Sequence, residues 1–274
     1  MATYKIVASD LDGTLLTNEH VLSPENAKAI SAMNALGVFF VPFTGRTLSE
    51  ILPALRDNPD VRYICYSNGA TILDKATGKK IEFVISNEKL NALFDVLTKY
   101  EVHYAVRHGG TCYCDASQMN DQAYSYYNLT SDHVDCVKTY STPVKEFIPF
   151  ARSLDSVEVV AMFFRHKDDL KKCQAEVLAL GGLGAAGVSE YNLEVFNTDA
   201  GKGNSLQALA NELNVPMPSV IAMGDSDNDV SMIKVAGLGL STSNGNDNIK
   251  ALADKVICSC DEHTAQYVLE NFIK

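Results

Sequence analysis

An apolar segment that ends in an acidic turn, close to the start of the chain, constrains the fold more than any other feature. Residues 4–8 form a short run that includes the β-branched Ile6 and Val7, as is typical of a buried strand. The segment runs into Ser9-Asp10-Leu11-Asp12-Gly13-Thr14, so two carboxylates emerge where the strand ends. Because side chains alternate between the faces of a strand, both carboxylates can serve one site only if the chain bends after Asp10. Gly13 permits that bend at little conformational cost.

Strands and helices alternate after this turn. Ser23-Pro24 is typical of a helix start, and Gly37 of a helix end, so a helix is expected between them. Residues 38–43 predict a second buried strand that runs into Thr44-Gly45-Arg46, with a helix over 48–55. Residues 62–66 predict a third strand, and 71–74 with 80–84 a hairpin around Thr77-Gly78. This order favours an α/β fold with a doubly wound, Rossmann-like parallel sheet and one antiparallel flap.

The pattern changes between residues 85 and 190. This segment mixes an amphipathic helix over 90–97, a strand pair at 102–107 and 111–114, and a second helix over 170–180. Residues 115–140 are polar and rich in tyrosine, and they give no clear periodicity. Alternation of strand and helix then resumes. We therefore expect a catalytic core made of residues 1–84 and 191–274, with an α+β domain of residues 85–190 inserted into it.

Composition excludes several classes of function. The formal net charge is −11 and there is no basic block, which disfavours nucleic acid and anionic membranes as partners. The opening residues lack the features of a signal peptide, and no later stretch is apolar enough to span a bilayer. Seven cysteines form an odd set, so we expect reduced thiols in a cytoplasmic protein. The Cys112/Cys114 and Cys258/Cys260 pairs lack the spacing of a zinc site.

Four polar clusters are candidates for one site. They are Asp10 with Asp12, Thr44-Gly45-Arg46, Lys202, and Asp225 with Asn228 and Asp229. Each alone is explained as an ordinary turn or helix cap, but three of them follow buried strands, whose carboxyl ends meet at one sheet edge. Converging carboxylates repel one another unless a cation is present. Hard oxygen ligands beside one lysine favour Mg²⁺ that holds a phosphate.

These clusters together resemble the motifs of the haloacid dehalogenase superfamily of phosphohydrolases. The matching segments are Asp10-Leu11-Asp12-Gly13-Thr14, Thr44-Gly45-Arg46, Asn68-Gly69-Ala70, Lys202 and Gly224-Asp225-Ser226-Asp227-Asn228-Asp229. The inserted segment resembles the large α/β cap of the Cof-type subfamily. One loop departs from the family pattern, because Ser241-Thr242-Ser243-Asn244-Gly245 stands where a sequence like Ala-Met-Gly-Asn-Ala is usual.

The resemblance implies a role for each residue. Asp10 would attack phosphorus and form an aspartyl-phosphate, and Asp12 would act as general acid and base. The resemblance also implies that phosphate is bound by Thr44, Gly45, Lys202 and Asn228. Asp229 would orient Lys202 or the surroundings of the metal. Mg²⁺ would be coordinated by the Asp10 carboxylate, the Asp12 backbone carbonyl and the Asp225 carboxylate.

The implied function is a Mg²⁺-dependent phosphatase that hydrolyses a small phosphorylated metabolite. Small sugar phosphates are the first expectation for the substrate, followed by pyridoxal phosphate or another phosphorylated metabolite. Two alternatives stay open at this point: a phosphosugar mutase on the same scaffold, and a phosphometabolite sensor that binds without turnover. The cap would choose the leaving group, with Arg107, His108, Tyr113 and residues 124–127 as candidates that we do not assign to the site.

Overall fold

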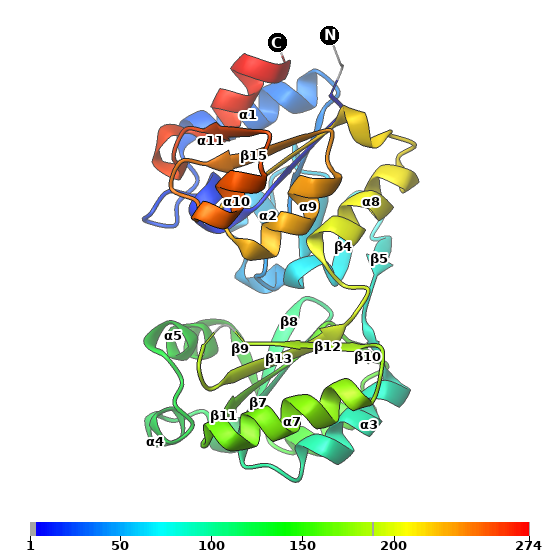
Figure 1. Cartoon of the computed structure of the whole chain (residues 1–274), viewed down its shortest axis with the longest axis vertical. Coiled ribbons are helices and arrows are strands. Elements are labelled where there is room, and N and C mark those ends of the chain that lie inside the picture. The colour runs from blue at the N-terminus through cyan, green and yellow to red at the C-terminus, as the bar shows by residue number, and fades with distance from the viewer. Residues whose placement is uncertain (1–3, 188, 274) are drawn as a thin grey trace. The chain divides into compact units, whose positions relative to one another are not determined.

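The computed structural model describes residues 4–187 and 189–273, which form two compact units (Figure 1). The first, which we call the core unit, comprises residues 4–46, 51–82 and 201–273. The second, the inserted unit, comprises Thr47–Glu50 and the described residues of Phe83–Ala200. No described helix is long and apolar enough to cross a membrane. All seven cysteines are free thiols.

A parallel sheet of five strands forms the centre of the core unit, in the order β16-β15-β14-β1-β2. The strands are β1 (Ile6–Ser9), β2 (Phe39–Pro42), β14 (Val220–Gly224), β15 (Leu238–Thr242) and β16 (Lys255–Ile257). Ile6 of β1 lies opposite Val220 on one side and Phe39 on the other. The strand order therefore reverses at β1, and open α/β sheets bind ligands at the carboxyl end of such a reversal.

Helices complete the core unit and confirm the predicted α/β fold with a parallel central sheet. Helix α1 packs against α11, and α8 packs against α9. The helices are α1 (Pro24–Ala35), α2 (Pro53–Arg56), α8 (Lys202–Glu212), α9 (Val230–Val235), α10 (Asp247–Leu252) and α11 (Thr264–Val268). The Ser23 hydroxyl accepts a hydrogen bond from the Asn26 amide at 3.2 Å, which is the cap that the Ser-Pro pair predicts.

The predicted hairpin is present, and the strand predicted at residues 62–66 is the third member of its sheet. The helix predicted before them is interrupted. Strands β3 (Tyr63–Tyr66), β4 (Thr71–Asp74) and β5 (Lys80–Glu82) form an antiparallel sheet. The helix expected over 48–55 is broken into a single turn at Leu48–Glu50 and the short α2. Leu52 has an extended backbone (ψ 136°) because Pro53 disfavours helical geometry in the residue before it.

The inserted unit contains a six-stranded sheet in the order β12-β13-β11-β7-β8-β9 and a separate pair, β6 with β10. Its strands are β6 (Ile85–Ser86), β7 (Val102–His108), β8 (Thr111–Asp115), β9 (Ser141–Val144), β10 (Ser156–Val157), β11 (Val159–Phe164), β12 (Leu183–Ala186) and β13 (Asn192–Asn197). Its helices are α3 (Asn87–Leu97), α4 (Asp121–Tyr126), α5 (Ser131–Tyr140), α6 (Phe147–Ser153) and α7 (Lys167–Ala179).

The two units join at positions that differ from those expected from sequence. Residues 191–200 belong to the inserted unit, because β13 pairs along its length with β11. Residues 83–84 belong to it as well, and Thr47–Glu50 joins it by a hydrogen bond from the Ser49 amide to the Gly110 carbonyl. Sequence periodicity reveals that a strand exists, but not which sheet it completes.

His103 of β7 makes the stability of the protein sensitive to acid. Burial among the rings of Tyr124, Tyr127 and Phe163 lowers the pKa of His103 to about 4. Above about pH 6.5 the imidazole is neutral in both states and has no effect. As the pH falls further, the unfolded chain binds the proton first, so stability is lost until about pH 4.

We expect this linkage to show in urea unfolding at two pH values. Between about pH 7.5 and about pH 5, the wild type should lose about 2 kcal/mol more unfolding free energy than a His103→Leu variant, which has no proton to bind. Equal losses in the two proteins would contradict the assignment.

Candidate active site

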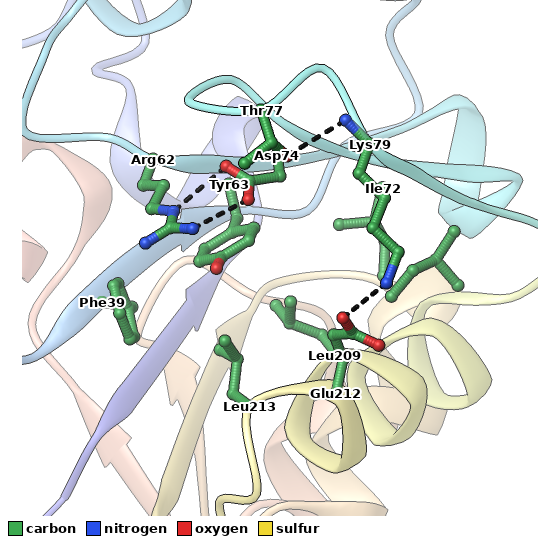
Figure 2. A pocket seen from close by; sticks show the side chains of 11 residues that line it. Phe39, Arg62, Tyr63, Ile72, Asp74, Thr77, Lys79, Leu209, Glu212 and Leu213 are labelled. Carbon is green, nitrogen blue, oxygen red and sulfur yellow. Dashed lines mark hydrogen bonds and ion pairs between the residues drawn. The ribbon is translucent and has the colours of Figure 1, made fainter.

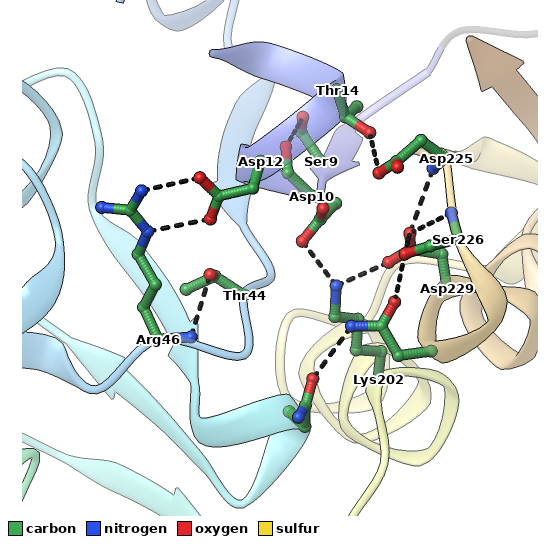
Figure 3. Close-up of polar contacts among 12 residues, drawn as sticks. Ser9, Asp10, Asp12, Thr14, Thr44, Arg46, Lys202, Asp225, Ser226 and Asp229 are labelled. Carbon is green, nitrogen blue, oxygen red and sulfur yellow. Dashed lines mark hydrogen bonds and ion pairs between the residues drawn. The ribbon is translucent and has the colours of Figure 1, made fainter. Parts of the chain in front are cut away.

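Three strands of the central sheet end beside one another and present polar side chains at the same edge (Figure 3). Asp10 follows β1, Thr44 follows β2 and Asp225 follows β14. Lys202 is the first residue of α8 and reaches the same place. The structure therefore brings the four predicted segments together at one edge of the central sheet of the core unit.

Lys202 is the centre of the arrangement. Its side chain is fully buried, and Nζ lies 2.6 Å from Oδ1 of Asp10 and 2.5 Å from Oδ1 of Asp229. Burial opposes the charge of Lys202, but the two carboxylates outweigh it and raise the pKa of the ammonium above its ordinary value. The lysine therefore stays charged in a place where a lone cation is costly.

One cation is too few for the carboxylates around it. Oxygen atoms of Asp10, Asp225 and Asp229 lie within 4.8 Å of one another. Burial raises the pKa of Asp10 to about 8; Lys202 opposes this rise, and the charges of Asp229 and Asp225 add to it. Burial and Asp229 also raise the pKa of Asp225. A divalent cation among these oxygens would supply the missing charge, so the donor set fits a hard metal ion.

Asp12 faces different partners. Arg46 donates to both of its oxygens, from Nε at 2.8 Å and from Nη2 at 2.6 Å, and Nδ1 of His20 lies 3.0 Å away. Partial burial favours the neutral acid, but Arg46 and then His20 outweigh it and lower the pKa of Asp12. The two carboxylates of the turn are therefore held in opposite electrostatic settings, and this is typical of an acid/base residue beside a nucleophile.

Gly13 makes this division possible. Its φ of 73° bends the chain after Asp12, and a Cβ at this position would lie 2.6 Å from Oδ2 of Asp225. The next residue, Thr14, donates from its hydroxyl to Oδ1 of Asp225 at 3.1 Å. The turn is therefore tied to the end of β14 and cannot accept a side chain at its bend.

The chain matches the model of the haloacid dehalogenase-like hydrolases over residues 7–269. That match covers nearly the whole chain, including both units. The chain belongs to this family. The resemblance expected from the motifs, and the enzyme class expected with it, a phosphatase of this family, are confirmed.

Known phosphatases are similar in sequence to this chain over nearly its full length. The phosphatase YwpJ of Bacillus subtilis is 25% identical over 285 residues, which cover 98% of this chain and 100% of the relative. The 5-amino-6-(5-phospho-D-ribitylamino)uracil phosphatase YwtE of the same organism is 27% identical over 288 residues, 98% of each chain.

Solved structures show the same fold. A haloacid dehalogenase-like hydrolase from Bacteroides thetaiotaomicron has a TM-score of 0.82 at 24% identity, covering 98% of this chain and 100% of its own. A sugar phosphatase of subclass IIB has a TM-score of 0.76 at 19% identity, covering 98% of both chains. At these identities the likeness is evidence for the fold alone.

The segment at the end of β2 forms a second part of the site in this hydrolase. The Thr44 hydroxyl accepts a hydrogen bond from the Arg46 amide at 3.1 Å, so its own proton is free to donate. The turn Ser67–Gly69 lies against it, because the Asn68 amide donates to the Thr44 carbonyl at 2.9 Å. A Cβ on Gly45 would lie 3.1 Å from the Asn68 side chain.

Asn228 reaches this second part from the short helical turn Asp227–Asp229 that follows β14. Its Nδ2 donates to Oδ1 of Asn68 at 3.1 Å, and its Oδ1 accepts from the Ser226 hydroxyl at 2.8 Å. Asp229 also accepts from the Asp225 and Ser226 amides at 3.1 Å, which fixes the carboxylate that contacts Lys202. All eight residues predicted for the site therefore lie in or directly beside it.

The structure gives contacts at the site to three residues for which the sequence predicted no role. His20 and Thr14 contact Asp12 and Asp225, and Asn68 holds Asn228. Thr14 and Asn68 lie in segments that match the family motifs, whereas His20 lies in none of them. The loop that departs from the family pattern borders the site, because Nδ2 of Asn244 donates to the Gly13 carbonyl at 2.7 Å.

Proposed function

We propose that this hydrolase is a Mg²⁺-dependent phosphatase that hydrolyses a small phosphorylated metabolite, with sugar phosphates as the leading class, through an aspartyl-phosphate. One observation carries the proposal. A buried carboxylate, Asp10, is held 2.6 Å from a buried lysine beside two further carboxylates, while Asp12 is held apart by Arg46. Similarity to the 5-amino-6-(5-phospho-D-ribitylamino)uracil phosphatase YwtE supports a small phosphorylated metabolite as the substrate.

The reaction would begin with Asp10. Its carboxylate attacks phosphorus, the bond from phosphorus to the leaving oxygen breaks, and the phosphoryl group passes to Asp10. Water then attacks the same phosphorus, which releases inorganic phosphate and regenerates the carboxylate. Splitting one slow hydrolysis into two displacements lowers the barrier of each.

Asp12 would serve both displacements. It gives a proton to the leaving alkoxide in the first and takes a proton from the attacking water in the second. Because Arg46 favours the ionised carboxylate, Asp12 is prepared for its role as base, and Arg46 must release an oxygen before Asp12 can carry a proton. A pure sensor gains nothing from such a residue.

The phosphoryl oxygens would be held from two sides. The Thr44 hydroxyl and the Gly45 amide donate from one side, and Lys202 and Asn228 from the other. Asp229 orients Lys202 by the contact already described. These donors are fixed before substrate arrives, so they stabilise the developing charge without further reorganisation.

Mg²⁺ would be coordinated by the Asp10 and Asp225 carboxylates and by the Asp12 backbone carbonyl. When bound, it supplies positive charge that neutralises the carboxylates and the phosphate oxygens. The inserted unit would be the cap that selects the leaving group, with Arg107, His108, Tyr113 and residues 124–127 as candidates.

Removal of divalent cations should stop the reaction. We expect phosphate release from p-nitrophenyl phosphate to fall at least about 100-fold in EDTA and to return with Mg²⁺. At the same concentration Mg²⁺ should also raise the melting temperature of the wild type more than that of Asp225→Asn, because the variant replaces an anionic oxygen ligand with a neutral one. Full activity in EDTA would exclude the proposed cofactor.

Replacement of Asp12 by Asn should separate the two displacements. With p-nitrophenyl phosphate, whose leaving group needs no proton, we expect a burst of one equivalent of nitrophenolate and then turnover reduced about 10²–10⁴-fold. With glucose 6-phosphate, no burst should occur. The control is Asp121→Asn, an exposed carboxylate of the inserted unit, which should behave as wild type. An isomerised hexose phosphate instead of free phosphate would indicate the mutase.

A further inference from the structure

A cavity of about 430 Å³ lies in the core unit away from the acidic cluster (Figure 2). It opens between the three-stranded flap and the C-terminal half of α8, and its size is in the range of small-molecule sites. Its apolar lining consists of Phe39, Tyr63, Ile72, Ile81, Leu209 and Leu213. The reaction proposed above uses none of these residues.

The cavity is separate from the acidic cluster although the two share helix α8. Lys202 begins this helix, whereas Leu209 and Leu213 line the cavity near its other end. Leu213 lies eleven positions after Lys202, just past the end of the helix, which corresponds to about 16 Å along the axis. Phe39 and Tyr63 likewise begin β2 and β3, whose opposite ends carry Thr44 and Ser67.

Charges at the rim of the cavity cancel. Arg62 donates from Nε and Nη2 to the two oxygens of Asp74 at 3.0 and 2.9 Å. Lys79 contacts Glu212 at 2.6 Å. The two positive and two negative side chains leave no net charge at the rim, so an ionic ligand gains no net attraction there and the rim favours a neutral molecule.

Tyr63 brings a polar group to the apolar lining of the cavity. Its side chain points into the cavity in Figure 2, and the residue is only 5% exposed. Among the described residues its ring makes a perpendicular contact with Phe39 and has the Arg62 guanidinium over its face. No hydrogen bond from a described residue reaches its hydroxyl, which stays accessible from the cavity. Burial, with the charge of Asp74, raises the pKa of Tyr63, so the hydroxyl keeps its proton. A protonated hydroxyl that opens into an apolar cavity without a protein partner is available to pair with a ligand.

We propose that this cavity is a second binding site, for a neutral, planar aromatic molecule that carries one hydrogen-bonding group. The ring packs between Phe39, Leu209 and Leu213, and its polar group pairs with the Tyr63 hydroxyl. The site is independent of the proposed reaction, because it needs neither the metal nor the phosphate.

Indole is a suitable probe, because it is neutral and planar and carries a single N–H. We expect the full-length protein to bind it with a dissociation constant on the order of 1 mM, measured by shifts of backbone amide resonances around the cavity. Tryptamine and indole-3-acetate, which add a positive or a negative charge, should bind more weakly. Absence of indole binding, or tighter binding of either ion, would overturn the proposal.

Two variants locate the site. Tyr63→Phe keeps the ring and should weaken indole binding about five-fold through loss of one hydrogen bond, whereas Tyr140→Phe, the same change at an exposed tyrosine of the inserted unit, should not. Leu213→Trp should fill the cavity and abolish binding. Both cavity variants should keep wild-type activity toward p-nitrophenyl phosphate. Unchanged indole binding in Tyr63→Phe would overturn the proposal even if Leu213→Trp failed to fold.

Discussion

Asp10→Asn is expected to reduce phosphate release by about 10⁴-fold or more, with the fold retained. The amide has nearly the same shape as the carboxylate, but it is a poor nucleophile and brings no charge to the metal. Relief of the crowding among Asp10, Asp225 and Asp229 should even raise the melting temperature in the absence of Mg²⁺.

The matched comparison is Asp225→Asn. It removes a carboxylate from the same cluster, but not the nucleophile, so raised Mg²⁺ should recover part of its activity. Asp10→Asn should gain nothing at any Mg²⁺ concentration. Wild-type turnover by Asp10→Asn in a freshly prepared sample would exclude Asp10 as the nucleophile.

Lys202→Met is expected to cost about 3–5 kcal/mol of unfolding free energy when no divalent cation is present. The methionine fills similar volume, so the loss comes mainly from charge. Asp10 and Asp229 are left buried without the ammonium that lies within 2.6 Å of both. Urea unfolding in EDTA measures this cost, and phosphatase activity should disappear with it.

A second substitution tests the origin of the loss. Adding Asp229→Asn to Lys202→Met should restore part of the stability, because it removes one of the two unpaired charges. Lys138→Met, which breaks an exposed pair with Asp121, should cost less than about 1 kcal/mol. If Lys202→Met were as mild as Lys138→Met, the buried lysine would not hold the carboxylates together.

The site could be predicted from sequence because its residues follow buried strands. Apolar runs before Asp10, Thr44 and Asp225 identify strand ends, and parallel strands bring such ends to one edge. Gly13 carried similar information, since the bend directly after the two carboxylates has a positive φ and leaves no room for a side chain beside Asp225. Local pattern and tertiary arrangement agree at these positions.

Features that depend on tertiary partners could not be predicted in this way. The partners of Asp12 come from 34 and 8 residues away, and neither Arg46 nor His20 has a spacing that indicates the contact. The end of the inserted unit depends on the pairing of β13 with β11, which periodicity does not encode. By contrast, Pro53 breaks the expected helix by a local rule that outweighs the apolar spacing around it.

The most direct test of the proposed mechanism is to locate the phosphoryl group. Asp12→Asn is mixed with p-nitrophenyl phosphate and Mg²⁺, quenched in acid during the burst and digested for mass spectrometry. The mechanism predicts one added phosphoryl group on the peptide that contains Asp10, removable by hydroxylamine, as an acyl phosphate is. A nitrophenolate burst with the phosphoryl group on another residue, or with no labelled peptide, would contradict it.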